Sequence, residues 1–124
     1  MIVLDTNYLI RILVPGTTEL ERVEAWLRES VALACPGISW YEFCCGPVTE
    51  RERALVLSLL SAGVLPLGEE EAIEAAHLFS ATGRQKSLRI DCLVAATALV
   101  AKAPLATSNT RDFAKFQPHG LQLV

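Results

Sequence analysis

The chain lacks the cysteine and histidine spacings of a structural metal site or a redox motif. Its four cysteines form no Cys-x-x-Cys pair, and its two histidines form no His-x-His group. Zinc ribbons and thioredoxin-like proteins are therefore excluded. No secretory signal precedes the cysteines and three of them lie in apolar stretches, so we expect buried thiols in a reduced, cytoplasmic protein. The four are Cys35, Cys44, Cys45 and Cys92.

The chain also lacks a membrane-spanning run, an excess of basic residues, repeats and low-complexity tracts. Its longest apolar stretch, residues 90–103, is interrupted by Asp91 and Lys102 and falls short of the roughly 20 residues that cross a bilayer. A net charge of −3 argues against binding nucleic acid through overall charge alone. Hydrophobic residues make up 52% of the chain, which predicts that a partner covers part of the surface.

The pattern that remains is an alternation of short apolar runs with segments of helical periodicity. Over 124 residues it predicts one domain, residues 1–124, with an α/β fold and a mainly parallel sheet of about five strands. Ser or Thr followed three positions later by Glu predicts a capped helix start at three places, and three glutamates open a further helix over residues 69–81. The predicted strands are residues 1–4, 31–35, 64–67, 104–107 and 121–124, and the predicted capping boxes are Thr18–Glu21, Ser39–Glu42 and Thr49–Glu52.

Four acidic residues follow strands or open helices of this pattern. Asp5 ends the first strand, and Asp112 lies just after the strand at residues 104–107. Glu42 and Asp91 are predicted in the first turns of crossover helices. In a parallel α/β sheet these positions share one edge, which is where ligands bind in such folds. We therefore expect the four carboxylates to meet there.

Carboxylates crowded into one cleft repel one another unless a cation lies between them. Mg²⁺ or Mn²⁺ prefers oxygen ligands and keeps several waters. Such an ion activates water and neutralises charge on a phosphodiester, so the cluster predicts metal-assisted phosphodiester hydrolysis. Structural roles remain open for two acids: Glu42 as the end of a capping box, and Asp112 in the first turn of its own helix.

The residues around these acids resemble the PIN domain, and more narrowly the VapC toxins of bacterial VapBC toxin–antitoxin systems. The resemblance covers nearly the whole chain, and no single motif decides it. It is carried by Val-Leu-Asp-Thr-Asn at residues 3–7, Trp-Tyr-Glu-Phe at 40–43, Asp-Cys-Leu-Val-Ala-Ala-Thr-Ala at 91–98 and Ala-Thr-Ser-Asn-Thr-Arg-Asp-Phe at 106–113.

The resemblance implies a three-layer α/β/α PIN-like fold and a magnesium- or manganese-dependent endoribonuclease acting on tRNA or rRNA. It implies that Asp5 and Asp91 bind the metal directly. Glu42 and Asp112 would complete the catalytic cluster, as metal ligands through water or by orienting the attacking water. Polar neighbours would hold these acids or the substrate; they are Thr6, Asn7 and Asn109.

RNA that approaches an acidic site needs nearby cations to hold its phosphates. Three basic residues precede Asp91 in the sequence, and two further basic residues are also candidates. The RNA-phosphate candidates are Arg11, Arg84, Lys86, Arg89 and Arg111, and plain solvation is the alternative for each.

The family resemblance also implies a homodimer and a VapB-type antitoxin that binds the toxin. No membrane partner is expected, because the longest apolar run is too short to cross a bilayer. A non-cleaving PIN-domain regulator and a DNA nuclease of the same superfamily are the alternatives. A phosphoacceptor signalling domain also gathers acids around Mg²⁺ at such an edge. It requires a Lys at the end of a late strand, where this chain has Thr107 and Ser108.

Overall fold

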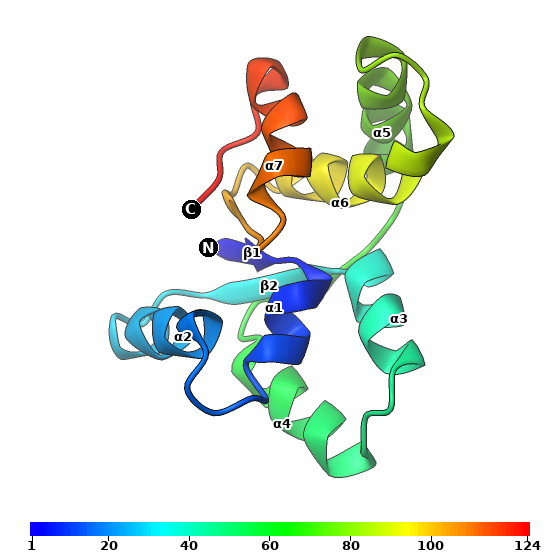
Figure 1. Cartoon of the computed structure of the whole chain (residues 1–124). Coiled ribbons are helices and arrows are strands. Elements are labelled where there is room, and N and C mark those ends of the chain that lie inside the picture. The colour runs from blue at the N-terminus through cyan, green and yellow to red at the C-terminus, as the bar shows by residue number, and fades with distance from the viewer.

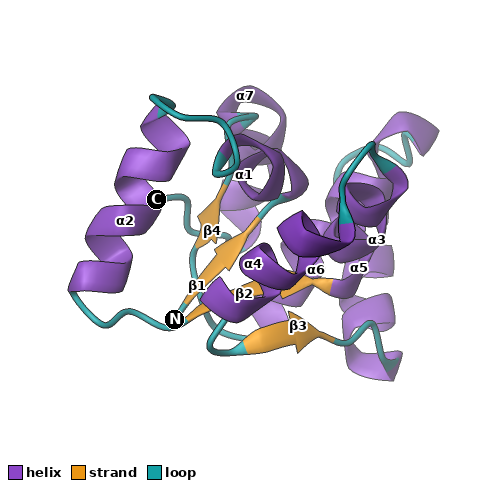
Figure 2. Ribbon diagram, turned by 90° about the horizontal axis from the view of Figure 1, so that it is seen from below, coloured by secondary structure: helices purple, strands orange, loops and turns teal.

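A parallel four-stranded sheet forms the centre of the computed structural model, which describes all residues from 1 to 124. The strand order is β3-β2-β1-β4, and every neighbouring pair is parallel (Figure 2). A fifth strand was expected near the C-terminus, where Leu123 instead makes an isolated parallel bridge to Leu105. The strands are β1 (Ile2–Leu4), β2 (Leu33–Pro36), β3 (Gly63–Leu65) and β4 (Leu105–Ala106).

Helices cover both faces of the sheet, which confirms the expected three-layer α/β/α arrangement. In Figure 1 the sheet lies in the middle, with the first four helices below it and the last three above it. No helix is long and apolar enough to span a membrane. The lower layer holds α1 (Thr6–Arg11), α2 (Thr18–Arg28), α3 (Gly37–Cys45) and α4 (Glu50–Leu59). The upper layer holds α5 (Glu69–Ala81), α6 (Arg89–Val100) and α7 (Thr110–Phe113), with short 3₁₀ helices η1 (Lys86–Leu88) and η2 (Ala114–His119).

Alternate residues of the strands enter two separate hydrophobic cores. Val3 packs into the core beneath α5 and α6, whereas Ile2 and Leu4 pack into the core formed with α1 to α4. This division follows from the two-residue period of a strand, whose successive side chains point to opposite faces. Because both faces are covered, β1 is apolar throughout, as parallel strands in α/β proteins are.

Two of the three predicted capping boxes are wrong. Thr17, not Thr18, is the N-cap of α2, and its hydroxyl accepts from the Leu20 N–H at 3.2 Å. Ser39 does not start α3, because the chain passes directly from β2 into the helix at Gly37, with Pro36 as an N-cap without a side-chain hydrogen bond. Glu42 therefore lies beyond the first turn of α3 and has no capping role.

The third capping box and the acidic helix are confirmed. Thr49 and Glu52 exchange both hydrogen bonds at the start of α4. The helix over residues 69–81 opens on its three glutamates as expected. Helix α4 ends earlier than the expected residue 62, because the Ala62 N–H donates to the Leu33 carbonyl and draws the chain into β3.

Candidate active site

Asp5 stands where β1 ends and α1 begins, and its side chain is fixed by three donors. Oδ1 accepts from the Thr6 N–H at 2.7 Å, which makes Asp5 the N-cap of α1. Oδ2 accepts from the Thr107 hydroxyl at 2.8 Å and from the Asn7 amide at 3.2 Å. The residue is 7% exposed. Burial raises the pKa of this carboxyl despite the hydrogen bonds, and the charge of Glu42 adds to the rise.

The loop after β4 forms the second wall of the site. Thr107 Oγ1 bonds Asp5 and also accepts from the Asn109 N–H at 3.0 Å. The Asn109 side-chain amide donates to Asp112 Oδ2 at 2.9 Å. On the other side, the Ser108 N–H donates to Asn7 Oδ1 at 2.9 Å. One hydrogen-bonded chain therefore connects Asp5 with Asp112, although they lie at opposite ends of the sequence.

Glu42 reaches the same edge from α3. Its Oε1 accepts from the Thr6 hydroxyl at 2.8 Å. Thr6 is itself the first residue of α1, so Asp5 and Glu42 are connected through a single residue. The side chain of Glu42 stays exposed, unlike that of Asp5.

Asp91 lies in the first turn of α6, as predicted, and the charges of the other three acids act on its carboxyl. The pKa of this carboxyl is raised from 3.8 to about 6, chiefly by burial. The charges of Asp5, Asp112 and Glu42 raise it further, in that order, and Lys115 lowers it. Hydrogen bonds link Asp5 with Glu42 and with Asp112, and Asp91 lies within range of their charges, so the convergence of all four carboxylates stays a prediction.

The donor set fits a hard divalent cation that keeps part of its water shell. All the donors are carboxylate oxygens, and two of the acids have pKa values raised by burial and by mutual repulsion, which a bound cation would relieve. No group of three or more acids, histidines or cysteines is close enough to form a ready metal cage. Mg²⁺ is typically held by one or two carboxylates with waters, so the looser arrangement suits it.

None of the predicted RNA-phosphate cations forms an ion pair with the four acids. The Arg11 guanidinium instead pairs with Glu19 at 3.1 Å. The guanidinium groups of Arg84 and Arg89 lie 6.0 and 5.7 Å from the centre of the Phe79 ring. Lys86 in η1 and Arg111 in α7 are exposed.

Four residues that contact or act on the acids, or hold their loop, were not predicted from the sequence: Thr107, Ser108, Glu19 and Lys115. Thr107 follows β4 directly, so the strand-end argument that found Asp5 could have found it. Lys115 lies three positions after Asp112, a helical spacing that places both on one side. Ser108 Oγ donates to Glu19 Oε1 at 2.7 Å, and the two residues are 89 positions apart in the sequence. No local sequence pattern predicts that contact.

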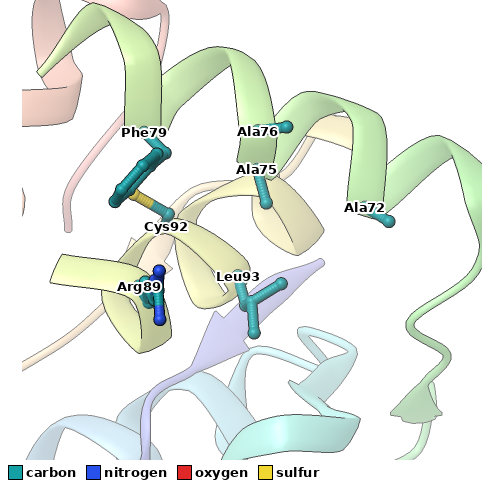
Figure 3. Close-up of a pocket in the computed structure, with 7 residues that line it drawn as sticks. All are labelled: Ala72, Ala75, Ala76, Phe79, Arg89, Cys92 and Leu93. Carbon is teal, nitrogen blue, oxygen red and sulfur yellow. The ribbon is translucent and has the colours of Figure 1, made fainter. Parts of the chain in front are cut away.

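The largest cavity of the molecule is not lined by the four acids, although its lining residues Cys92 and Leu93 directly follow Asp91. It has a volume of about 270 Å³ between α5 and α6 and is almost entirely apolar. Figure 3 shows α5 contributing Phe79 and α6 contributing Arg89, Cys92 and Leu93. None of the four acids lines it, so it is not the site of the acid chemistry.

The fold and these acids define the class of this protein, an α/β protein with a parallel sheet, in which Asp5 directly follows β1 and Asp112 lies in the helix after β4. A family model of the PIN domain matches residues 2–117. The chain therefore belongs to the PIN domain family. No curated protein matches the sequence.

Solved structures with the same fold come from bacterial complexes. A chain of FitAcB from Neisseria gonorrhoeae is 25% identical with a TM-score of 0.75, over 99% of this chain and 96% of that one. A chain of a toxin–antitoxin complex from Klebsiella pneumoniae is 25% identical with a TM-score of 0.73, over 92% and 91%. A chain of VapBC2 from Rickettsia felis, bound to a DNA fragment from its promoter, is 21% identical with a TM-score of 0.75, over 100% and 98%.

Proposed function

We propose that this protein is a metal-dependent endoribonuclease toxin of the VapC type, neutralised by a protein antitoxin. The observation that carries the proposal is the hydrogen-bonded chain that joins Asp5 to Glu42 through Thr6 and to Asp112 through Thr107 and Asn109. The charges of these three acids also act on Asp91. Membership of the PIN family and the likeness to chains of toxin–antitoxin complexes support it.

Asp5 and Asp91 are the proposed direct ligands of Mg²⁺ or Mn²⁺, as the resemblance to PIN-domain nucleases implies; Asp5 directly follows β1, and Asp91 lies in the first turn of α6. Glu42 and Asp112 are proposed to contact the ion through water or to orient the attacking water. When bound, the ion supplies charge neutralisation at the phosphodiester and activation of water.

The polar neighbours hold this arrangement in place. Thr6 orients Glu42, and Asn109 orients Asp112, each through one hydrogen bond. Thr107 and Asn7 donate to Asp5 Oδ2 and leave the carboxylate in one orientation. Groups held in this way lose little entropy when substrate binds, which is how positioned residues accelerate reactions.

RNA is proposed to lie across the acidic edge with its flanking phosphates near basic side chains. Lys115 is the strongest candidate, since its charge already acts on Asp91. Arg84, Lys86, Arg89 and Arg111 are exposed and free of ion pairs, which keeps them available for phosphates. Arg11 is held by Glu19 and is the weakest of the predicted set.

The proposed partners are a VapB-type antitoxin and a second copy of the chain, in the cytoplasm. Large apolar side chains remain exposed on α1, α3, α4 and α5 and in the turn after α1, and they give a partner surface to cover. Size-exclusion chromatography with light scattering should return the mass of a dimer for the purified protein. The most exposed of these side chains are Tyr41, Leu55, Ile73, Ile10 and Val14.

Cleavage of a mixed RNA pool by the purified, antitoxin-free protein tests the nuclease proposal. We expect cutting with Mg²⁺ or Mn²⁺, none with EDTA, and none in folded Asp5→Asn or Asp91→Asn variants. Glu24→Gln is the matched control, because Glu24 is an exposed acid of α2 that makes no hydrogen bond or ion pair with another side chain.

Three other outcomes separate the alternatives. Cutting of DNA but not RNA would indicate a DNA nuclease of the same superfamily. Mn²⁺ binding that requires Asp5 and Asp91, with no cutting of either nucleic acid, would favour a non-cleaving regulator. The absence of both metal binding and cleavage would overturn the catalytic interpretation of the acidic cluster.

A further inference from the structure

One face of α2 contacts α1 and the loop after β4, although α2 carries none of the four acids. Glu19, Arg22 and Trp26 recur at helical spacing and therefore share that face. The Arg22 guanidinium donates to the Tyr8 hydroxyl of α1 and lies 5.0 Å from the centre of the Trp26 ring. These contacts fix α2 against α1, the helix that begins at Asp5.

The start of α2 is fixed as well. Thr17 caps the helix, and its hydroxyl also donates to the Arg11 carbonyl at the end of α1, at 2.8 Å. Glu19 lies in the first turn of α2, between the Thr17 cap and the Arg22 contact with α1, and both contacts fix its backbone position. A side chain anchored in this way can hold another segment without a large loss of its own entropy.

Glu19 uses this position to hold the loop that follows β4. Its Oε1 accepts from the Ser108 hydroxyl at 2.7 Å, and its Oε2 lies 3.1 Å from Arg11 Nε. The Glu19 side chain is only 13% exposed, whereas that of Arg11 is 53% exposed. The Ser108 hydrogen bond is the main cause that lowers the pKa of Glu19, so the carboxylate is charged when it accepts.

Ser108 stands between the two residues that orient the acids. Thr107 before it bonds Asp5, and Asn109 after it bonds Asp112. Its own N–H donates to Asn7, which also bonds Asp5. Ser108 is itself exposed, so apart from the Asn7 bond the loop is held at this point by the Glu19 carboxylate.

We propose that Glu19 is a positioning residue of the acidic site, which acts by accepting the Ser108 hydroxyl and so holding Thr107 and Asn109 against Asp5 and Asp112. The proposal rests on the nuclease function proposed above for its effect on cleavage, but its structural part can be tested without that function. Arg11 then serves to neutralise the second oxygen of Glu19 and does not bind RNA.

The test compares Glu19→Ala, Glu19→Gln and Ser108→Ala with wild type by amide hydrogen exchange at Ser108 and Asn109 and by steady-state RNA cleavage. Glutamine keeps an acceptor for Ser108 but loses the charge that pairs with Arg11. Glu21→Ala is the matched control, because Glu21 is the other acid of the same helix turn and is exposed. Circular dichroism and a thermal unfolding curve establish that each variant is folded.

We expect Glu19→Ala and Ser108→Ala to speed exchange of both amides by about tenfold or more, as expected for a lost hydrogen bond to a charged group. The kcat should fall by about tenfold to a hundredfold with KM within about twofold, because positioning is lost while RNA contacts remain. The double variant Glu19→Ala/Ser108→Ala should show no larger change in exchange or kcat than either single variant. Glu19→Gln should retain most of the wild-type behaviour, and Glu21→Ala all of it.

Unchanged exchange in folded Glu19→Ala would overturn the proposal, as would equal losses in Glu19→Gln and Glu19→Ala or a change in KM alone. A wild-type protein that cuts no RNA would refute the nuclease function, and the exchange data would then still decide whether Glu19 holds the loop. An effect of Glu21→Ala equal to that of Glu19→Ala would assign the result to helix stability and refute the positioning role.

Discussion

Replacing Asp91 by Asn should make the metal-free protein more stable, although Asp91 is a proposed metal ligand. Its carboxyl has a pKa near 6 instead of 3.8, because burial and the charges of three other acids disfavour the ionised form. Each pKa unit corresponds to about 1.4 kcal/mol, which gives an upper limit of about 3 kcal/mol at neutral pH. Asp91 keeps partial contact with water, so we expect about 1–2 kcal/mol after screening.

The stabilisation should depend on pH with a definite sign. A carboxyl whose pKa is raised on folding destabilises the folded state when ionised, so the penalty grows as pH rises from about 4 and is complete above about 6. Asn carries no such penalty. The advantage of Asp91→Asn should therefore be largest near pH 8 and nearly absent at pH 4.

Urea and thermal unfolding in EDTA at the two pH values measure this difference. At pH 8 the midpoint temperature of Asp91→Asn should exceed that of wild type by about 4–8 °C. Added Mn²⁺ should stabilise wild type and leave the variant unaffected. Glu24→Gln should show neither effect, since Glu24 is exposed. Destabilisation by Asp91→Asn at pH 8, or an equal change at both pH values, would refute the repulsion argument.

Three further substitutions test individual contacts. Thr107→Val removes the buried hydroxyl that donates to Asp5 and should lower the free energy of unfolding by about 1.5–3 kcal/mol in urea, with loss of RNA cleavage; a change below about 0.5 kcal/mol would contradict this. Thr49→Ala breaks the capping box of α4 and should cost about 1 kcal/mol while cleavage stays at the wild-type rate, so reduced cleavage would be unexpected. Gly63 has φ of +77° with nothing within 4 Å of an added Cβ, so Gly63→Ala should cost about 1–2 kcal/mol through backbone strain alone, and a neutral result in thermal unfolding would contradict that explanation.

Much of the fold could be predicted from local sequence. Three elements are predicted by side chains only a few residues apart: β1 by its apolar run, α5 by its first-turn glutamates and α4 by the Thr49–Glu52 capping box. The errors lie where tertiary contacts override local signals. Ser39 looks like a cap but is fully buried inside α3, because β2 leads into the helix without a loop. Residues 60–62 are not helical, because the Ala62 N–H donates to the Leu33 carbonyl of β2.

The acids of the candidate site could be predicted for a similar reason. Asp5, Asp91 and Asp112 each stand at a strand end or a helix start, and the parallel topology alone sends such positions to one edge. Their partners could not be found in this way. Glu19 and Ser108, or Asn7 and Ser108, meet only after strands distant in the sequence pair, with separations of 89 and 101 residues.

The sequence by itself determined that this chain forms a layered α/β protein with carboxylates at one sheet edge, because strand and helix periodicity and helix capping act over a few residues. The tertiary structure decided which oxygen each carboxylate offers, which donors hold it, and that Arg11 is paired with Glu19. It also set the pKa of Asp91, since burial and the charges of Asp5, Asp112 and Glu42 exist only once the chain is folded.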